Sequence, residues 1–335
     1  MSTIQIPVSV LNLVPIRQGQ DTRSAINSMV TLAKRTEEMG YSRYWIAEHH
    51  NSKTLVSSAT SILIKHTLEH TNSIRVGSGG IMLPNHSPLV VAEQFGTMAA
   101  IYPDRLDLGL GRAPGTDMMT ANALRRSNQN ESVYTFPEDV KQLLTYFGPE
   151  EVQDYVKAYP GVNASIPLYI LGSSTDSAHL AAKLGLPYVF ASHFAPRAME
   201  EAISIYRDRF QPSAYLDKPY MIVCVNVIAS ETDEEAARES TSMSQFFLNV
   251  VRGTSNPLLP PIDTMEGIWT QPEREMAKSM TSVSFIGSKE TIKDQLTSFQ
   301  EKYQVDEIMA VSYIYDEEKQ IRSYEILKEV VEGKE

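Results

Sequence analysis

The stretch Tyr41-Ser-Arg-Tyr-Trp-Ile-Ala-Glu-His-His50 begins with apolar and aromatic residues and ends in a carboxylate and two imidazoles. Its apolar part, 41–47, is typical of a buried strand, and the polar segment 51–53 follows it. Burying an ionisable group without a partner costs several kcal/mol, so three together indicate the end of a strand rather than its interior. Parallel α/β enzymes carry their chemistry at such carboxyl ends. A solvated loop start with one core-packed histidine would give the same pattern, and both interpretations stay open here.

The order of the three polar residues bears on metal binding. Adjacent residues of a strand point to opposite faces, so His49 and His50 are a poor pair of metal ligands unless the strand ends at His49. No other His or Cys stands nearby at ligand spacing. The spacing therefore predicts no metal site and favours a histidine that acts as general acid or base, because imidazole titrates near neutral pH.

Outward from this stretch, short apolar runs alternate with amphipathic segments along the whole chain. This alternation predicts parallel βαβ units, and the nearly continuous apolar runs suit strands covered on both faces. We therefore predict an α/β fold, a (β/α)8 TIM barrel that forms one domain over residues 1–335. The eight predicted strands are 6–11, 42–47, 73–82, 105–110, 167–171, 186–191, 220–228 and 307–312.

Capping residues mark several of the helices between these strands. Asp21, the pair Ser87-Pro88 and Ser288 are suited to helix N-termini, and Gly40 to a left-handed C-terminal cap. The apolar stripes that follow are typical of core-facing helices. Their members are Ile26, Met29, Val30, Ala33, Val91, Phe95, Met98, Ile292, Leu296, Phe299, Ile321, Tyr324, Leu327 and Val331.

Two segments interrupt the rhythm. Residues 113–165 are longer than one connecting helix requires, and 252–280 contain Pro260-Pro261 without clear periodicity. Connections of this length are usually insertions or lids, and we expect both at the carboxyl ends of the strands.

Composition and charge exclude several classes of protein. The chain has 335 residues, 42% of them hydrophobic and 21% charged, with a net charge of −11. This charge argues against nucleic acid or an anionic membrane as a partner. No apolar run approaches the roughly 18 residues of a membrane span, and no signal peptide precedes the first strand. The single cysteine, Cys224, lies in an apolar run and is expected to be a buried strand residue. We expect a cytoplasmic protein.

Three segments at strand ends have compositions suited to ligands. Leu106 to Gly115 contains Gly109, Gly111 and Gly115, whose spacing fits neither the dinucleotide fingerprint nor the P-loop; Arg112 follows directly and could contact an anion. Ser78-Gly79-Gly80 places two glycines inside a strand, which suits a flat ring against the backbone or a bulge.

The third segment, Ile170-Leu-Gly-Ser-Ser-Thr-Asp-Ser177, runs from a strand into a helix. Gly172, Ser173, Ser174 and Ser177 then surround free backbone N–H groups at a helix N-terminus, which form a natural phosphate site. A helix start simply capped by Ser174 is the structural alternative. We favour phosphate because three hydroxyls and a glycine coincide.

Together these segments resemble the bacterial luciferase-like flavin monooxygenases, in order and over nearly the whole chain. The matching residues are Trp45-x-x-Glu48-His49-His50, Val76 to His86 with Pro88, Ala92-Glu-Gln-Phe95, Tyr102 to Arg112 with Gly115-Thr-Asp117, Leu171 to Ser174 with Ser177-Ala178, and Phe285 to Ser288. The resemblance implies a (β/α)8 barrel that binds reduced FMN and O2 at the carboxyl ends of its strands. It also implies that a separate flavin reductase supplies the reduced FMN.

By the same resemblance, His49 matches the catalytic histidine beside the flavin, and we take Glu48 with it as the second catalytic candidate. The Gly79–Gly80 peptide matches a non-prolyl cis bond against the flavin ring. Arg112, Gly172, Ser173, Ser174 and Ser177 match the phosphate site. The reactive cysteine of bacterial luciferase falls on Gly111, so light emission is not expected.

We therefore predict a monooxygenase that uses reduced FMN and O2 on a small organic substrate, and we expect a homodimer. A reductase that uses the deazaflavin F420 is the first alternative. F420 has a long anionic tail, so a basic groove would favour this alternative, and Arg125-Arg126 is the local candidate for such a groove. A non-catalytic flavin-binding chain is the second, against which the intact Glu48-His49-His50 argues.

Overall fold

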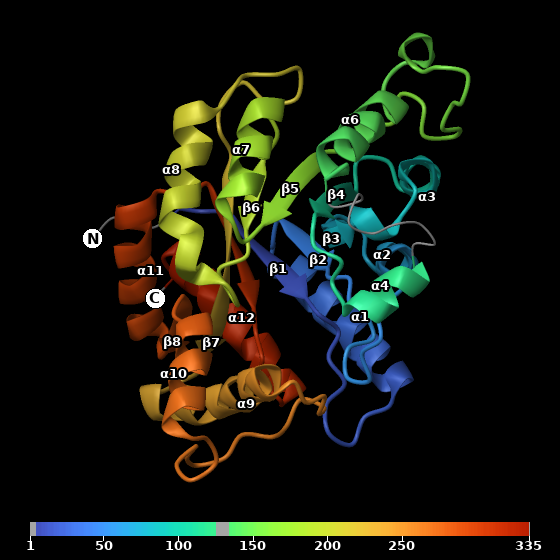
Figure 1. The fold of residues 1–335 in the computed structure, drawn as a ribbon. Coiled ribbons are helices and arrows are strands. Elements are labelled where there is room, and N and C mark those ends of the chain that lie inside the picture. The colour runs from blue at the N-terminus through green and yellow to red at the C-terminus, as the bar shows by residue number, and fades with distance from the viewer. Residues whose placement is uncertain (1–4, 125–133, 335) are drawn as a thin grey trace.

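A computed structural model describes residues 5–124 and 134–334. Eight parallel strands close into a barrel in the order β1-β2-β3-β4-β5-β6-β7-β9, and β9 returns to β1 (Figure 1). These strands are β1 (Val8–Asn12), β2 (Arg43–Ile46), β3 (Arg75–Met82), β4 (Leu106–Gly111), β5 (Leu168–Gly172), β6 (Tyr188–Phe190), β7 (Met221–Ala229) and β9 (Glu307–Val311). The predicted barrel is confirmed, with strand ends displaced by a few residues.

The sequence did not reveal one short strand, β8 (Ser284–Gly287). It pairs with the second half of β7, from Asn226 to Ala229, beyond the part of β7 that pairs with β6. Four residues with alternating burial are too few to stand out as a strand, which explains the omission.

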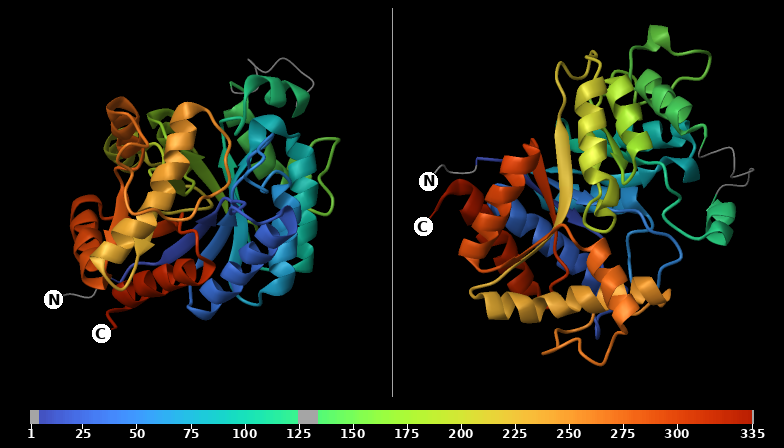
Figure 2. Two further views of the ribbon diagram at one scale, coloured as in Figure 1. Left: turned by 90° about the horizontal axis from the view of Figure 1, so that it is seen from below. Right: turned by 60° about the vertical axis from the view of Figure 1, so that its left-hand side comes forward.

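Helices surround the strands on the outside, as the views from below and from the side show (Figure 2). The connecting helices are α1 (Thr22–Glu38), α2 (Thr60–His70), α3 (Pro88–Ile101), α7 (Thr175–Leu184), α8 (Met199–Arg209), α9 (Asp233–Arg252), α11 (Lys289–Tyr303) and α12 (Glu317–Glu332). Asp21 caps α1 by accepting from the Ser24 amide at 2.8 Å, and Ser288 caps α11. Ser87 precedes α3 without a side-chain cap, so Pro88 at the first helical position defines that start.

The core lies mainly between the barrel and these helices. All the predicted stripe residues are buried except Ile26, which is partly buried and packs against the same core. A second apolar cluster lies within the barrel and at its mouth, and Trp45, Cys224 and Tyr313 belong to it. Cys224 is a buried residue of β7, as predicted.

Charged side chains fill the amino-terminal end of the barrel interior. Arg43 donates to both carboxylate oxygens of Glu307, at 2.8 and 3.0 Å, and to Asp107 at 2.9 Å. It also donates to the hydroxyl of Tyr169 at 2.6 Å. The three charged residues begin β2, β4 and β9 or lie one position inside them, so this network ties three separate strands together.

The two long connections carry helices of their own. The β4–β5 connection holds α4 (Met118–Leu124), α6 (Phe136–Tyr146) and the 3-10 turn η2 (Glu150–Val152). The β7–β8 connection holds α9 and α10 (Gln271–Met280). Two further 3-10 turns, η1 (Leu83–Asn85) and η3 (Pro196–Ala198), follow β3 and β6. Among the described residues, none of the helices has the length and apolar character needed to cross a bilayer.

Candidate active site

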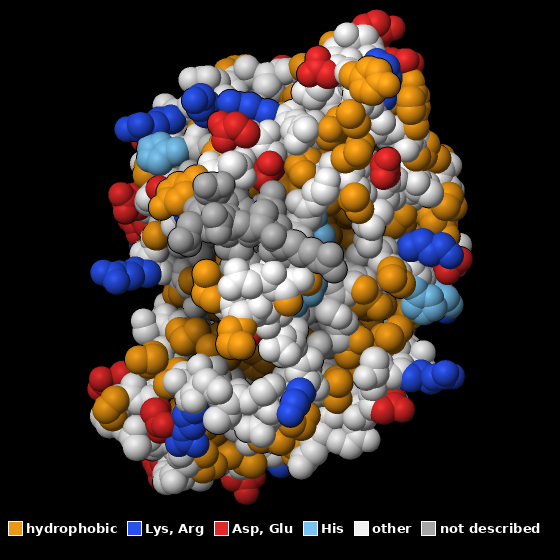
Figure 3. All heavy atoms as spheres, turned by 45° about the vertical axis from the view of Figure 1, so that its right-hand side comes forward, with side chains coloured by type: hydrophobic (Ala, Val, Ile, Leu, Met, Phe, Trp, Pro, Cys, Tyr) orange, Lys and Arg blue, Asp and Glu red, His pale blue; other side chains and the backbone are white. Residues whose placement is uncertain are grey.

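A cavity of about 510 Å³ lies at the carboxyl ends of the barrel strands. Every barrel strand contributes residues to it, directly or from the segment that follows, and α9 and α10 close part of it with apolar side chains. The face in Figure 3 presents hydrophobic side chains around a central hollow, with charged side chains mainly toward the edges. The lining residues include Leu11, Leu13, Ala47, Leu55, Met82, Leu171, Val189, Phe246, Phe247, Val250, Met280, Met309 and Tyr313. The polar groups of the cavity are therefore few and stand out.

His49 is one of these groups. Its backbone amide donates to the carbonyl of Ser57 at 3.0 Å, which fixes the turn after β2, while its ring lines the cavity. The ring atom Nδ1 is buried and has no hydrogen-bond partner among the described residues. Burial lowers the pKa of His49 to about 4, and the neighbouring Glu48 carboxylate only partly offsets that shift. The imidazole is thus neutral at physiological pH and able to accept a proton.

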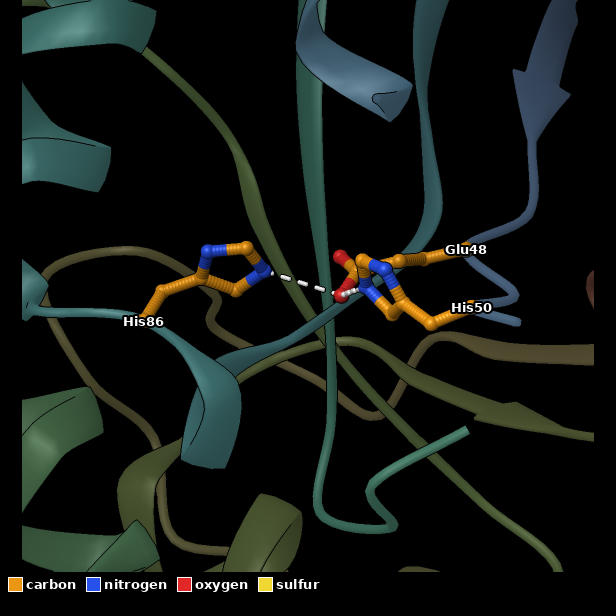
Figure 4. Close-up of side chains that lie close together, drawn as sticks. All are labelled: Glu48, His50 and His86. Atoms are coloured by element: carbon orange, nitrogen blue, oxygen red, sulfur yellow. Dashed lines mark hydrogen bonds and ion pairs between the residues drawn. The ribbon is translucent and has the colours of Figure 1, made fainter. Parts of the chain in front are cut away.

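Glu48, the other catalytic candidate, is not among the residues that line the cavity. Its side chain is 1% exposed and turns toward the β3–α3 connection. One carboxylate oxygen, Oε1, accepts from Nε2 of His50 at 2.7 Å and of His86 at 2.8 Å, and Oε2 accepts from the Met82 amide at 3.1 Å (Figure 4). Burial alone would raise the pKa of Glu48, but these hydrogen bonds and the charge of His86 outweigh it and lower the pKa to about 2. Glu48 is therefore placed to position neighbouring residues rather than to touch a bound molecule.

Glu48, His50 and His86 lie close enough together to hold a metal ion. Carboxylate and imidazole atoms of Glu48, His50 and His86 all lie within 4.8 Å of one another. The sequence analysis considered His49 with His50 and missed His86, which comes from a segment that follows another strand. Both imidazoles already bind the carboxylate at hydrogen-bond distance, so a chain without a metal satisfies the cluster internally.

His193, just after β6, is a residue that the sequence analysis did not single out. It lines the cavity and is 6% exposed, and its Nδ1 is also buried with no partner in the part of the chain that the structure describes. Burial, with a smaller contribution from His49, lowers the pKa of His193 to about 3. A histidine within an otherwise apolar strand end, in Phe190-Ala-Ser-His193, was the available signal.

The predicted glycines form one wall of the cavity. The Gly79–Gly80 peptide bond is cis, as the resemblance implied. A Cβ on Gly79 would lie 2.5 Å from Cδ1 of Leu11, and one on Gly80 would lie 2.8 Å from the carbonyl oxygen of Gly109. The backbone is packed too closely here for a side chain, which leaves a flat surface toward the cavity.

The predicted phosphate residues also meet at the cavity. Arg112, which follows β4, reaches Asp176 at 3.1 Å and remains 37% exposed. Ser173 and Ser174 precede α7, and the hydroxyl of Ser174 makes no capping hydrogen bond to the helix. The N-terminus of a 10-residue helix, two serines and a guanidinium thus face one end of the cavity.

Ser177 contributes differently from its neighbours. Its hydroxyl donates to the carbonyl of Ser174 at 2.8 Å and lies 2.9 Å from the hydroxyl of Tyr188. A Cβ on Gly172 would lie 1.9 Å from this hydroxyl, so glycine is required at 172 for the turn to close. Ser177 and Gly172 therefore shape the turn that presents the other two serines. The basic pair Arg125-Arg126 lies outside the described residues.

Comparison with known proteins accords with this arrangement. Residues 6–304 match the family model described as luciferase-like monooxygenase. The chain is 50% identical to an uncharacterised protein, YddN, of Bacillus subtilis, with 97% of this chain and 96% of that protein covered. It is 44% identical to the luciferase-like monooxygenase of Escherichia coli, with 99% of each chain covered.

Among solved structures, apo-MsnO8 has a TM-score of 0.89 and 32% identity, with 98% of each chain covered. Two more distant structures share the fold alone. A type II Baeyer-Villiger monooxygenase in complex with FMN has a TM-score of 0.72 and 16% identity, over 98% of each chain. An F420-dependent secondary alcohol dehydrogenase has a TM-score of 0.70 and 14% identity, over 99% of each chain. The match over most of its length means that this chain belongs to the luciferase-like monooxygenase family and is an oxygen-using oxidoreductase.

Proposed function

We propose that this chain is a monooxygenase that uses reduced FMN and O2 to oxidise a small organic molecule. The observation that carries the proposal is that one largely apolar cavity combines a group of anion-binding residues with a buried neutral imidazole. Arg112 and the start of α7 form the anion-binding end, and His49 supplies the imidazole.

The described residues fit both parts of FMN. The phosphate would lie against the amides at the start of α7, the free Ser174 hydroxyl and the Arg112 guanidinium. The flat ring would lie against the Gly79–Gly80 backbone, where no side chain intervenes. The FMN complex of the Baeyer-Villiger monooxygenase supports the choice of FMN, since that protein has the same fold.

The chain's own residues then have distinct tasks. Reduced FMN supplies the electrons that activate O2, which protein side chains cannot do. The apolar walls exclude water from the cavity, and Arg112 orients the cofactor by its phosphate. His49, neutral at physiological pH, exchanges a proton at its ring nitrogen with the reacting groups. Glu48 fixes the backbone beside His49 through Met82, His50 and His86.

We further propose that a separate flavin reductase supplies the electrons, and that the protein is a cytoplasmic homodimer. The absence of a dinucleotide fingerprint from the sequence supports the first point. The purified protein should therefore oxidise NADH or NADPH slowly, and adding a flavin reductase with FMN should start O2-dependent turnover. Rapid NAD(P)H oxidation by the protein alone would contradict the two-component scheme.

The cofactor test compares three ligands by anaerobic titration: reduced FMN, reduced riboflavin and reduced F420. We expect reduced FMN to bind most tightly, and more tightly than oxidised FMN. Preferential binding of reduced F420 would contradict the proposal and indicate an F420-dependent reductase. The fold shared with the F420-dependent alcohol dehydrogenase is the reason to test this alternative. Failure of all three to bind would contradict the proposal, and flavin binding without O2-dependent turnover would indicate a non-catalytic flavin-binding chain.

A further inference from the structure

The proposed function leaves His193 without a task. The side chain is 6% exposed, lines the cavity, and forms no hydrogen bond through either ring nitrogen with the described residues. A buried polar atom without a partner costs about 1–3 kcal/mol, so such atoms are rare unless a ligand or water completes them. Packing alone therefore leaves both ring nitrogens of His193 without a partner among the described residues.

His193 and His49 reach the cavity from opposite walls. In the closed order of eight strands, β2 and β6 are four strands apart in either direction. His49 follows β2 and His193 follows β6, and the two imidazoles are close enough for His49 to lower the pKa of His193. A molecule that lies across the barrel mouth would thus have one imidazole on each side.

The backbone of His193 is held firmly. Asn226 on β7 donates from Nδ2 to the His193 carbonyl at 2.8 Å, and Ser192 donates to the Cys224 carbonyl at 2.6 Å. The Phe194 ring packs edge-on against the imidazole, with centroids 4.9 Å apart. The backbone that carries the ring is therefore held before any ligand arrives, which reduces the entropy lost on binding.

The rest of the lining indicates the chemistry of that ligand. No acidic side chain is found among the described residues that line the cavity, and Arg112 is the one Lys or Arg side chain among them. Because Arg112 belongs to the phosphate end, the remaining space suits an uncharged and mostly apolar molecule. His193, His49, Tyr313 and Cys224 are the polar side chains that border this space.

The tautomer follows from the same contacts. An orphaned buried N–H is rarer than an under-satisfied acceptor, so the proton is better placed on Nε2 than on the enclosed Nδ1. In this tautomer the buried Nδ1 remains an unpaired acceptor, and Nε2–H is the hydrogen-bond donor that a ligand can complete.

We propose that His193 recognises the substrate by donating a hydrogen bond from Nε2 to an acceptor atom on an uncharged, largely apolar molecule held between His193 and His49. The inference rests on the proposed function in assigning Arg112 to the phosphate and in naming the bound molecule a substrate. The hydrogen bond itself can be tested without flavin.

The test uses a pair of probes with matched shapes, cyclooctanone and methylenecyclooctane. They differ in a C=O that accepts a hydrogen bond and a C=CH2 that does not. Binding to the flavin-free protein labelled with [15N]histidine is followed by NMR. We expect about fivefold tighter binding of the ketone, together with a shift of the His193 ring nitrogens, since a net hydrogen bond contributes about that factor.

Four variants locate the contact. His193→Phe should bring the ketone-to-alkene ratio close to one, and His193→Gln should restore part of it because an amide N–H replaces the donor. Tyr313→Phe, which removes another hydroxyl of the lining with little change of volume, and Met280→Leu, an apolar change in the same lining, should keep the wild-type ratio.

Three results would overturn the proposal: a ratio near one in the wild type, an unchanged ratio in His193→Phe, or a ratio lost in Tyr313→Phe instead. Reduced FMN binding and melting temperature are measured on the same variants, and both should stay near wild type in His193→Phe. A wild-type protein that keeps the ketone preference but fails to bind reduced FMN would refute the proposed function while leaving the His193 contact standing.

Discussion

The carboxylate of Glu48 accepts a hydrogen bond of 2.8 Å from Nε2 of His86, which lies 38 residues further along the chain. This contact joins the segment after β2 to the turn after β3, and His50 completes it from the other side (Figure 4). His49, next to Glu48 in sequence, faces the cavity instead. Two adjacent residues thus have different roles at this strand end: Glu48 connects the two loops, and His49 faces the cavity.

Replacing Glu48 tests the holding role through the pH dependence of stability. The pKa of Glu48 is lowered from 4.5 to about 2, so its stabilising contribution is complete above pH 4.5 and is lost as the pH falls toward 2. At about 1.4 kcal/mol per pKa unit, this contribution is roughly 3 kcal/mol. Glu48→Gln should lower the free energy of unfolding at pH 7 and flatten its decline on acidification.

Urea denaturation of wild type and variant at several pH values between 7 and 3 measures both effects. Glu301→Gln, on the exposed side of α11, is the control and should follow the wild-type curve. A Glu48→Gln curve parallel to that of the wild type would show that the carboxylate contributes nothing through its ionisation.

Replacing His49 tests the proposed chemistry. A well-placed acid or base contributes about 10²–10⁴-fold to a rate, so His49→Ala should reduce product formation by about that factor and release more peroxide. Binding of FMN should stay close to wild type, because His49 does not belong to the phosphate end. His70→Ala, at the exposed end of α2, should leave product and peroxide yields unchanged. A destabilised but fully coupled His49→Ala enzyme would mean that the residue only packs.

The pH profile gives an independent view of the same imidazole. Because burial lowers the pKa of His49 to about 4, the base remains deprotonated well below neutrality. Product formation should therefore change little between pH 7 and 5 and decline only toward pH 4. An inflection near 6.5, the ordinary value, would contradict a buried His49 as the responsible base.

Arg112 should discriminate FMN from riboflavin, because only FMN carries the phosphate. Arg112→Ala should weaken FMN binding about tenfold or more and riboflavin binding little, as charge-assisted hydrogen bonds contribute more than neutral ones. Asp176→Asn removes the carboxylate that pairs with Arg112 at 3.1 Å and should strengthen FMN binding. Titration of both ligands against both variants measures the difference. Equal losses for FMN and riboflavin would exclude Arg112 from the phosphate site.

Mutations in the buried network around Arg43 should lower the free energy of unfolding more than mutations of exposed charged residues. Arg43→Met leaves Glu307 buried without a cation, which typically costs about 3–5 kcal/mol, whereas Asp107 keeps its ion pair with Arg75 at 2.7 Å. Chemical denaturation should show this loss, whereas Arg209→Met at the exposed end of α8 should cost less than about 0.5 kcal/mol. A loss for Arg43→Met as small as that of the control would mean that the network is not stabilising.

Much of the fold follows from local sequence. The eight barrel strands appear as apolar runs because strands covered on both faces must be apolar throughout, and the helices appear through their stripes and caps. The additional strand β8 was missed because it has four residues and pairs with one strand, so its hydrophobic pattern is too short to recognise.

At the site, the sequence indicated residues that share a strand end, such as Glu48 with His49 and Gly172 with Ser177. All seven residues predicted to bind the cofactor line the cavity, namely Gly79, Gly80, Arg112, Gly172, Ser173, Ser174 and Ser177. Their part in cofactor binding stays a prediction. The sequence could not show that the Ser177 hydroxyl is engaged by the Ser174 carbonyl, because that depends on the closure of the turn.

What the sequence determined by itself is therefore periodic and local: the alternation of strands and helices, the caps, and the polar residues at strand ends. Tertiary structure alone decided that Glu48 turns away from the cavity toward His86, and that His193 faces His49 from the opposite wall. The physical reason is that barrel closure brings together residues far apart in the chain. Which side chains then meet depends on strand order, register and the course of each connecting loop, and periodicity carries no information about these.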